Sequence, residues 1–122
     1  MAHLRQAFNI YKAIGNREGE ATTLGNLANV YHLKRESQKS MEYQQLALKI
    51  HREIGNREGE ANSLGNIGNL YGEKGESDET LRYYKLALKV FDEIGASENI
   101  KKTKENIVNF ELWLKQRRTI KR

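Results

Sequence analysis

The sequence repeats itself at an offset of 40 residues. The segment IGNREGEATTLGNLANVY at Ile14–Tyr31 returns as IGNREGEANSLGNIGNLY at Ile54–Tyr71. The rest of the unit also returns, because YQQLALKIHREIG at Tyr43–Gly55 matches YYKLALKVFDEIG at Tyr83–Gly95. A weaker third copy begins at Ile94. A repeat of this length is one supersecondary unit that buries its apolar surface only against neighbouring units, so the sequence predicts a stack of such units.

Each unit is expected to contain two helices. Its apolar positions step by three and four residues, as Ala21, Leu24 and Ala28 do, and this is the period of a helix and not of a strand. The absence of proline and a charged content of 30% also favour helices with solvated outer faces. We therefore expect an all-α fold, with helices over residues 17–34, 37–54, 57–74 and 77–94.

Glycine and serine mark the expected helix ends. Gly15, Gly55 and Gly95 each follow an apolar residue that closes a long periodic run, where a glycine in the left-handed conformation commonly caps a helix. Ser37 and Ser77 precede long periodic segments, so we expect them to be the N-caps of the second helices.

Two motifs carry a family resemblance. LGNLANVY at Leu24–Tyr31 and LGNIGNLY at Leu64–Tyr71 resemble the W-x-x-L-G-x-x-Y pattern of the first helix of a tetratricopeptide repeat (TPR), with Leu in place of Trp. Ala47 and Ala87 match the small position of the second helix. The usual period is about 34 residues, so the longer unit is similar to the TPR variety of spindle-orientation scaffolds and kinesin light chains. The resemblance implies a right-handed α-solenoid of stacked antiparallel helix pairs.

The resemblance also implies how the chain is divided. Residues 1–122 form a single TPR-like domain, which begins with the second helix of a truncated repeat over 2–15. Two full repeats follow, over 17–54 and 57–94. Residues 97–118 form either a degenerate first helix of a third repeat or a capping helix, because Lys104 stands where the earlier copies have a large apolar residue. A basic tail occupies 119–122.

Asparagines recur at the same positions in all three first helices, namely Asn26, Asn29, Asn66, Asn69, Asn106 and Asn109. Asparagine costs roughly 0.5 kcal/mol or more relative to alanine inside a helix, so their recurrence needs a reason. A carboxamide both donates and accepts hydrogen bonds, which suits the main chain of an extended peptide. In the long TPR variety such asparagines hold a bound peptide in the concave groove, and the resemblance implies the same here. Alternatively, they bond helix to helix and fix the stacking register between units.

Two other repeated pairs lie near these asparagines. Gly25 and Gly65 either open space for the close approach of a backbone or permit tight packing. Arg17 and Arg57 either bind an acidic partner at the rim of the groove or pair with the glutamate that follows each of them in a solvated turn.

The first expected helix lacks the companion that precedes each later copy, so its apolar residues have a neighbour on one side only. These residues are Leu4, Ala7, Phe8, Tyr11 and Ile14. Either the chain is a segment of a longer array, or two chains meet here as a homodimer with Leu4, Phe8 and Tyr11 at the contact. The sequence therefore predicts a scaffold that binds a protein or peptide partner, with a self-assembling structural unit as the alternative.

The net charge of +5 belongs to the C-terminal residues. Residues 1–100 carry 13 Lys and Arg against 14 Asp and Glu, whereas residues 101–122 carry 8 against 2. The terminal run KQRRTIKR has no interleaved aromatic residue, and basic residues stabilise a helix C-terminus by themselves. The charge therefore argues against nucleic acid as a partner.

No pattern of residues indicates catalysis, so we expect neither enzymatic activity nor a cofactor or metal. The chain has no cysteine for a thiolate zinc site. His3, His32 and His51 lack the spacing of metal ligands and are expected on the surface. No stretch approaches the roughly 20 apolar residues that a membrane span requires, and we expect a cytoplasmic protein.

Overall fold

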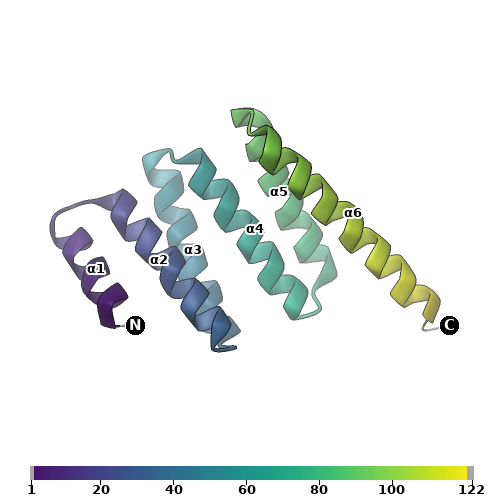
Figure 1. The fold of residues 1–122 in the computed structure, drawn as a ribbon, viewed down its shortest axis with the longest axis horizontal. Helices are drawn as coiled ribbons and strands as arrows, with labels where there is room; N and C mark the ends of the chain where they lie inside the picture. The colour runs from purple at the N-terminus through teal and green to yellow at the C-terminus, as the bar shows by residue number, and fades with distance from the viewer. Residues whose placement is uncertain (1, 121–122) are drawn as a thin grey trace.

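Six helices follow one another in the computed structural model of the chain, which describes residues 2–120 and the side chains as far as residue 118. They are α1 (Ala2–Ala13), α2 (Arg17–Leu33), α3 (Ser37–Ile54), α4 (Arg57–Glu73), α5 (Ser77–Ile94) and α6 (Ser97–Ile120). Successive helices run antiparallel and stack side by side from one end of the molecule to the other (Figure 1). The predicted all-α solenoid of helix pairs is confirmed.

The helix bounds agree closely with the prediction. Helices α3 and α5 have the predicted bounds, and α2 and α4 each end one residue early. Helix α1 ends at Ala13, whereas α6 continues to Ile120, past the expected end at 118. Residues 121 and 122 of the expected basic tail lie outside the described residues. Between residues 2 and 120, no helix is both long and apolar enough to cross a membrane.

Glycine closes helices where the sequence predicts it. Gly15, Gly55 and Gly95 have φ angles of 74°, 71° and 69°, which lie in the left-handed region that favours glycine. At the end of α3, the Gly55 N–H donates to the carbonyl of Arg52 at 3.3 Å. This satisfies one of the carbonyls that a helix C-terminus leaves free.

The predicted N-caps are wrong. Ser37 and Ser77 are the first residues of α3 and α5, and the capping positions before them are Glu36 and Glu76, which form no side-chain cap hydrogen bond. A cap side chain reaches the free N–H groups only from a residue outside the helix, so serine stands one position too late. Side-chain caps occur instead on the first helices, where Asn16 and Asn56 accept from the N–H of the glycine three residues later at 2.9 Å.

The core lies between successive helices, because each helix packs mainly against its neighbours in the chain. A buried cluster joins α3, α4 and α5, and includes Leu64, Ile67 and Phe91. A second cluster joins α2 and α3 through Leu24 and Ile50. All the periodic positions of the first copy are buried as predicted, namely Ala21, Leu24, Leu27, Ala28 and Tyr31.

Candidate functional site

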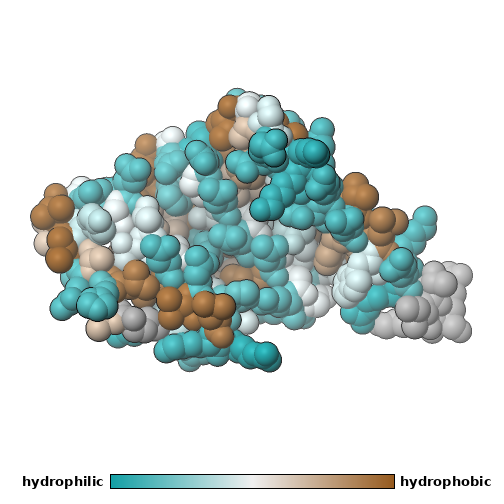
Figure 2. Space-filling model, in the orientation of Figure 1, coloured by the Kyte–Doolittle hydropathy of each residue, from teal (hydrophilic) through white to brown (hydrophobic). Residues whose placement is uncertain are grey.

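The first helices of the repeats, α2, α4 and α6, lie side by side on one face, with α3 and α5 behind them (Figure 1). Figure 2 shows that the centre of this face is mainly hydrophilic or neutral, while hydrophobic surface lies towards the N-terminal end, along the upper and lower edges, and in places over α6. The centre of the face therefore offers mainly polar groups to a partner.

Two hollows open on this face between neighbouring first helices. The α2–α4 hollow has a volume of about 300 Å³, and residues of α3 complete its lining. The α4–α6 hollow has a volume of about 180 Å³, and residues of α5 complete its lining. The repeated asparagines in these linings are Asn26, Asn29, Asn66, Asn69 and Asn106. We call the two hollows and the six repeated asparagines the groove.

The carboxamides of the groove are mostly unpaired. Asn69 accepts a hydrogen bond from the hydroxyl of Tyr84, which joins α4 to α5 within one repeat. The other five side chains form no hydrogen bond among the residues that the structure describes, and all six are exposed. Asn109 is exposed on α6, three residues beyond Asn106. Within the described chain, these five asparagines therefore form no hydrogen bonds that could fix the stacking register between units.

Gly25 and Gly65 face open space. A methyl group added at either position would have nothing within 4 Å, so the alternative that these glycines permit tight packing is wrong. Both lie inside helices with ordinary negative φ angles, where glycine costs about 0.5–1 kcal/mol relative to alanine. Gly25 lines the α2–α4 hollow and Gly65 lines the α4–α6 hollow. The described chain supplies no packing reason for either glycine.

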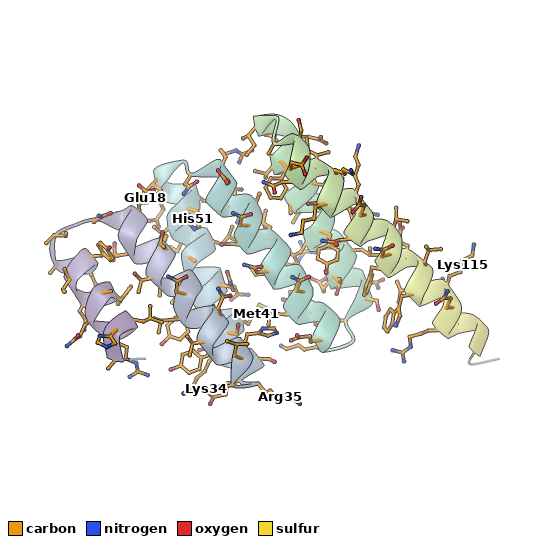
Figure 3. The ribbon with its side chains drawn as sticks, viewed as in Figure 1. Glu18, Lys34, Arg35, Met41, His51 and Lys115 are labelled. Carbon is orange, nitrogen blue, oxygen red and sulfur yellow. The ribbon has the colours of Figure 1, made fainter. Side chains whose placement is uncertain are left out.

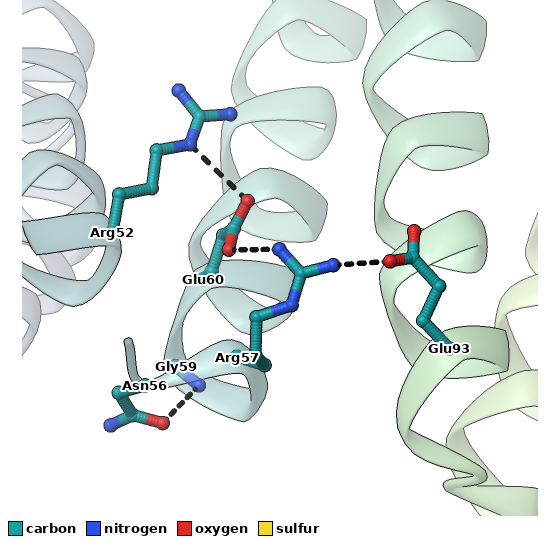
Figure 4. A network of polar contacts seen from close by, with 6 residues as sticks. All are labelled: Arg52, Asn56, Arg57, Gly59, Glu60 and Glu93. Atoms are coloured by element: carbon teal, nitrogen blue, oxygen red, sulfur yellow. Dashed lines mark hydrogen bonds and ion pairs between the residues drawn. The ribbon is translucent and has the colours of Figure 1, made fainter. Parts of the chain in front are cut away.

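The repeated arginines are engaged in ion pairs, as Figure 4 shows for Arg57. The Arg57 guanidinium lies 2.8 Å from a carboxylate oxygen of Glu60 and 2.6 Å from one of Glu93. Arg52 reaches Glu60 from α3 at 3.2 Å, so this carboxylate joins two repeats. Arg17 repeats the arrangement with Glu20 and Glu53.

These contacts correct the expected partners of the arginines. The paired glutamates are Glu20 and Glu60, three residues after each arginine, and not the adjacent glutamates Glu18 and Glu58. Each arginine also pairs with a glutamate 36 residues away on the second helix of its own repeat. The arginines therefore join the two helices of a repeat.

His51 is buried, which contradicts its expected place on the surface. Its side chain belongs to a residue only 8% exposed, and within the described chain Nδ1 has no hydrogen-bond partner. Burial lowers the pKa of His51 below its usual value of 6.5, and the carboxylates of Glu18 and Glu60 oppose this shift. Figure 3 shows Glu18 near His51, and His51 lines the α2–α4 hollow. His3 and His32 are exposed as expected.

Sequence reasoning missed one row of the groove. Thr22 and Asn62 line the α2–α4 hollow, and Lys102 occupies the equivalent position in the lining of the α4–α6 hollow. Each lies four residues before a repeated asparagine and hence on the same helix face. The four-residue spacing from the repeated asparagines could have identified these three positions from the sequence.

The apolar residues of α1 divide between two sides. Leu4, Phe8 and Tyr11, the expected self-association residues, are half-buried on the side of α2, where Phe8 packs against the Leu24 cluster. Ile10 and Ile14 are 59% and 69% exposed. The outward apolar surface of α1 and the turn after it is therefore centred on these two isoleucines, of which the sequence prediction included only Ile14.

Comparison with known proteins identifies the repeat. The sequence profile of the tetratricopeptide repeat matches residues 20–93. Among solved structures, BtubC (BKLC) from P. vanneervenii is similar with a TM-score of 0.69 and 20% identity over 88% of this chain. The chain spans 48% of the length of BtubC. No curated protein matches the sequence.

A second similar structure is the N-terminal domain of stress-induced protein-1 (STI-1) from C. elegans. It has a TM-score of 0.60 and 17% identity, and the match covers 85% of this chain and 91% of that domain. At these identities the two structures indicate a shared fold and nothing more. The profile match spans more than half of the 122 residues, so the chain belongs to the tetratricopeptide repeat family.

Proposed function

We propose that the chain is a non-enzymatic scaffold that binds an extended peptide segment of a partner protein in the groove. Tetratricopeptide repeats generally mediate protein–protein interaction, which supports a protein partner. The observation that carries the proposal is the set of five asparagines without a hydrogen bond inside the described chain, at equivalent positions on three helices.

The chemistry of a carboxamide matches that of an unpaired main chain. An extended peptide exposes N–H donors and C=O carbonyl acceptors, and an asparagine side chain complements both. Each hydrogen bond contributes only about 0.5–1.5 kcal/mol net, so useful affinity needs several of them in a row. The peptide must therefore cross more than one first helix to meet enough of these carboxamides.

The same features support the other parts of the proposal. Carboxamides supply neither a nucleophile nor a general base, which favours binding over catalysis. The groove carries both signs of charge, with Glu58 in one hollow and Lys102 in the other, so it suits a peptide better than a nucleic acid. We place the chain in the long TPR variety because of its 40-residue offset, and in the cytoplasm because it has no cysteine.

The test is a peptide selection followed by matched variants. A displayed library of random peptides is selected against the native chain, and the binders are measured by calorimetry. Asn26→Ala combined with Asn66→Ala should weaken them at least about tenfold, while helicity and melting temperature are kept. Asn9→Ala, on an exposed position of α1, is the control and should leave affinity unchanged. Equal binding by the native chain and the double variant would reject the groove as the site.

A second candidate function is self-assembly through the outer side of α1. Ile10 is 59% exposed, whereas its equivalents Ile50 and Val90 are only 7% and 5% exposed because they pack against the preceding first helix. The proposed homodimer contact centres on Ile10 and Ile14, with Leu4, Phe8 and Tyr11 at its margin.

Light scattering at high micromolar concentration tests the second candidate. The native chain should have the mass of a dimer, and Ile10→Ser with Ile14→Ser should reduce it to a monomer. Leu33→Ser, at an exposed leucine on α2, is the matched control and should remain a dimer. A monodisperse native monomer would exclude self-assembly through α1.

A further inference from the structure

All but one of the described glycines inside the first helices are of two kinds, the exception being Gly72. Gly19, Gly59 and Gly68 are packing glycines, because an added methyl group would lie less than 3.0 Å from a ring atom of Tyr11, His51 or Tyr84 respectively. Gly25 and Gly65 differ, since a methyl group there would meet nothing within 4 Å. Internal packing explains the first kind and leaves the second without a reason inside the described chain.

On each of α2 and α4, the polar residues of the groove form a stripe along one helix face, and an open glycine lies at its centre. On α2, Gly25 lies beside Asn26 and one helical turn from Thr22 and Asn29. On α4, Gly65 has the same position relative to Asn62, Asn66 and Asn69. Each stripe is therefore a bare patch of helix surface bordered by hydrogen-bonding side chains, and the two patches are one repeat apart.

Among the described residues, the wall of the α2–α4 hollow also holds one buried side chain with an unpaired polar atom, His51. His51 lines the α2–α4 hollow together with Gly25, is only 8% exposed, and has a ring nitrogen without a partner in the described chain. Buried polar groups in proteins nearly always have a hydrogen-bond partner, so an exception in the wall of a hollow calls for an explanation. The Nδ1 of His51 lies against Gly59 and has almost no accessible surface, so a polar ligand in the hollow would bond it only after the ring turns.

We infer that a bound peptide crosses α2 and α4 at Gly25 and Gly65, with its main chain closer to these helices than any side chain would permit. This inference rests on the proposed function. The bordering carboxamides of Asn26 and Asn66 then hold the peptide main chain from the side, while the missing side chains let it approach. Glycine is the residue that allows a ligand to come this close to a helix backbone.

The first helix of the third repeat, α6, differs at the equivalent positions, and this ends the path of the peptide main chain. At the equivalent positions α6 carries Glu105 in place of the glycine and Lys102 in place of the threonine or asparagine. Both are exposed, and Lys102 lines the α4–α6 hollow. The main chain of the peptide therefore cannot lie as close to α6 as to α2 and α4, and the peptide meets charged groups there.

Substitution by alanine tests the inference, because it should change stability and binding in opposite directions. The probe is a peptide selected from the random library against the native chain. Gly25→Ala and Gly65→Ala should each raise the melting temperature by about 2–4 °C, since alanine is the better helix former and has room. Each should weaken the peptide about tenfold, because the methyl group occupies the place of the main chain.

Gly72→Ala is the matched control. It lies on the same helix as Gly65, and an added methyl group would make an ordinary contact of 3.4 Å with Thr80. It should leave the affinity for the peptide unchanged. Loss of affinity in this variant equal to that of Gly65→Ala would overturn the inference, because the effect would then come from the helix and not from the groove.

The remaining outcomes separate the two proposals. If Gly25→Ala and Gly65→Ala bind like the native chain while the Asn26 and Asn66 double variant loses binding, the inference is wrong and the proposed function stands. If the asparagine variant also binds normally, or if the library yields no binder, both fail. A fall in melting temperature on Gly25→Ala would give this glycine a packing role and reject the inference.

Discussion

The imidazole of His51 lies directly on the backbone of Gly59, so closely that a methyl group added to this glycine would lie less than 3.0 Å from Nδ1. The contact joins the second helix of one repeat to the first helix of the next. Tyr11 makes the same contact with Gly19 one repeat earlier. This position therefore places a ring on a glycine at two successive junctions of the stack.

Gly59→Ala should destabilise the protein by about 1–3 kcal/mol, although alanine is the better helix former, because the ring of a buried residue must move aside. Gly65→Ala on the same helix should stabilise it by about 0.5–1 kcal/mol, because it has open space. Urea unfolding of both variants measures the difference. If both changes shift stability in the same direction, the distinction between packing and open glycines is wrong.

The stability of the native chain should fall as the pH is lowered through the usual histidine pKa of 6.5. Burial lowers the pKa of folded His51, so the unfolded chain takes up the proton first and acid favours unfolding. The stability that neutral His51 contributes is fully present above pH 6.5, and it is lost as the pH falls from there towards the lower pKa of His51 in the folded state. Thermal unfolding at a series of pH values measures it.

His51→Phe is the control for this pH dependence, because phenylalanine occupies the equivalent buried position at Phe91. The variant should lose less stability between neutral and mildly acidic pH than the native chain, since its ring does not titrate. Parallel stability curves for the two proteins would show that His51 is not the group responsible.

The Arg57–Glu93 ion pair should couple the two helices of the second repeat weakly. Both side chains are nearly half exposed, so a double-mutant cycle with Arg57→Ala and Glu93→Ala should give about 0.5 kcal/mol. High salt should reduce this coupling, because it screens exposed charges. A coupling that is absent at low salt, or that grows with salt, would contradict an electrostatic role for the pair.

Asn56→Ala should cost about 1 kcal/mol, because its side chain accepts the hydrogen bond from the N–H of Gly59 at the start of α4. Ser77→Ala should change stability by less than about 0.5 kcal/mol, since Ser77 is the first helical residue of α5 and not its cap. Chemical denaturation compares the two. A larger loss of stability in Ser77→Ala than in Asn56→Ala would show that the serine does cap its helix.

Local features of the chain could be predicted from the sequence. The helix period and the glycines at helix ends depend on residues close together, so the bounds of α3 and α5 and the left-handed cap at Gly55 were predicted correctly. The capping residue was harder, because Asn56 and Ser77 both precede periodic segments and only the turn geometry shows which side chain lies outside the helix.

Features that depend on packing could not be predicted from local pattern. One of the two partners of Arg57 is 36 residues away, and sequence proximity favoured the adjacent glutamate instead. His51 was expected on the surface because the histidines lack the spacing of metal ligands, although the equivalents Tyr11 and Phe91 were a signal for a packed ring. The asparagine positions followed from the repeat, whereas the open space beside Gly25 and Gly65 required the coordinates.

The helices of this stack are connected in series, since each packs mainly on the next one along the chain. Weakening one junction, such as the contact of His51 with Gly59, therefore leaves the others able to hold on their own. A ligand that lies across α2 and α4 would connect these two helices directly, in addition to their junctions through α3. Occupancy of the groove would then make the units unfold together, with a sharper transition as well as a higher midpoint.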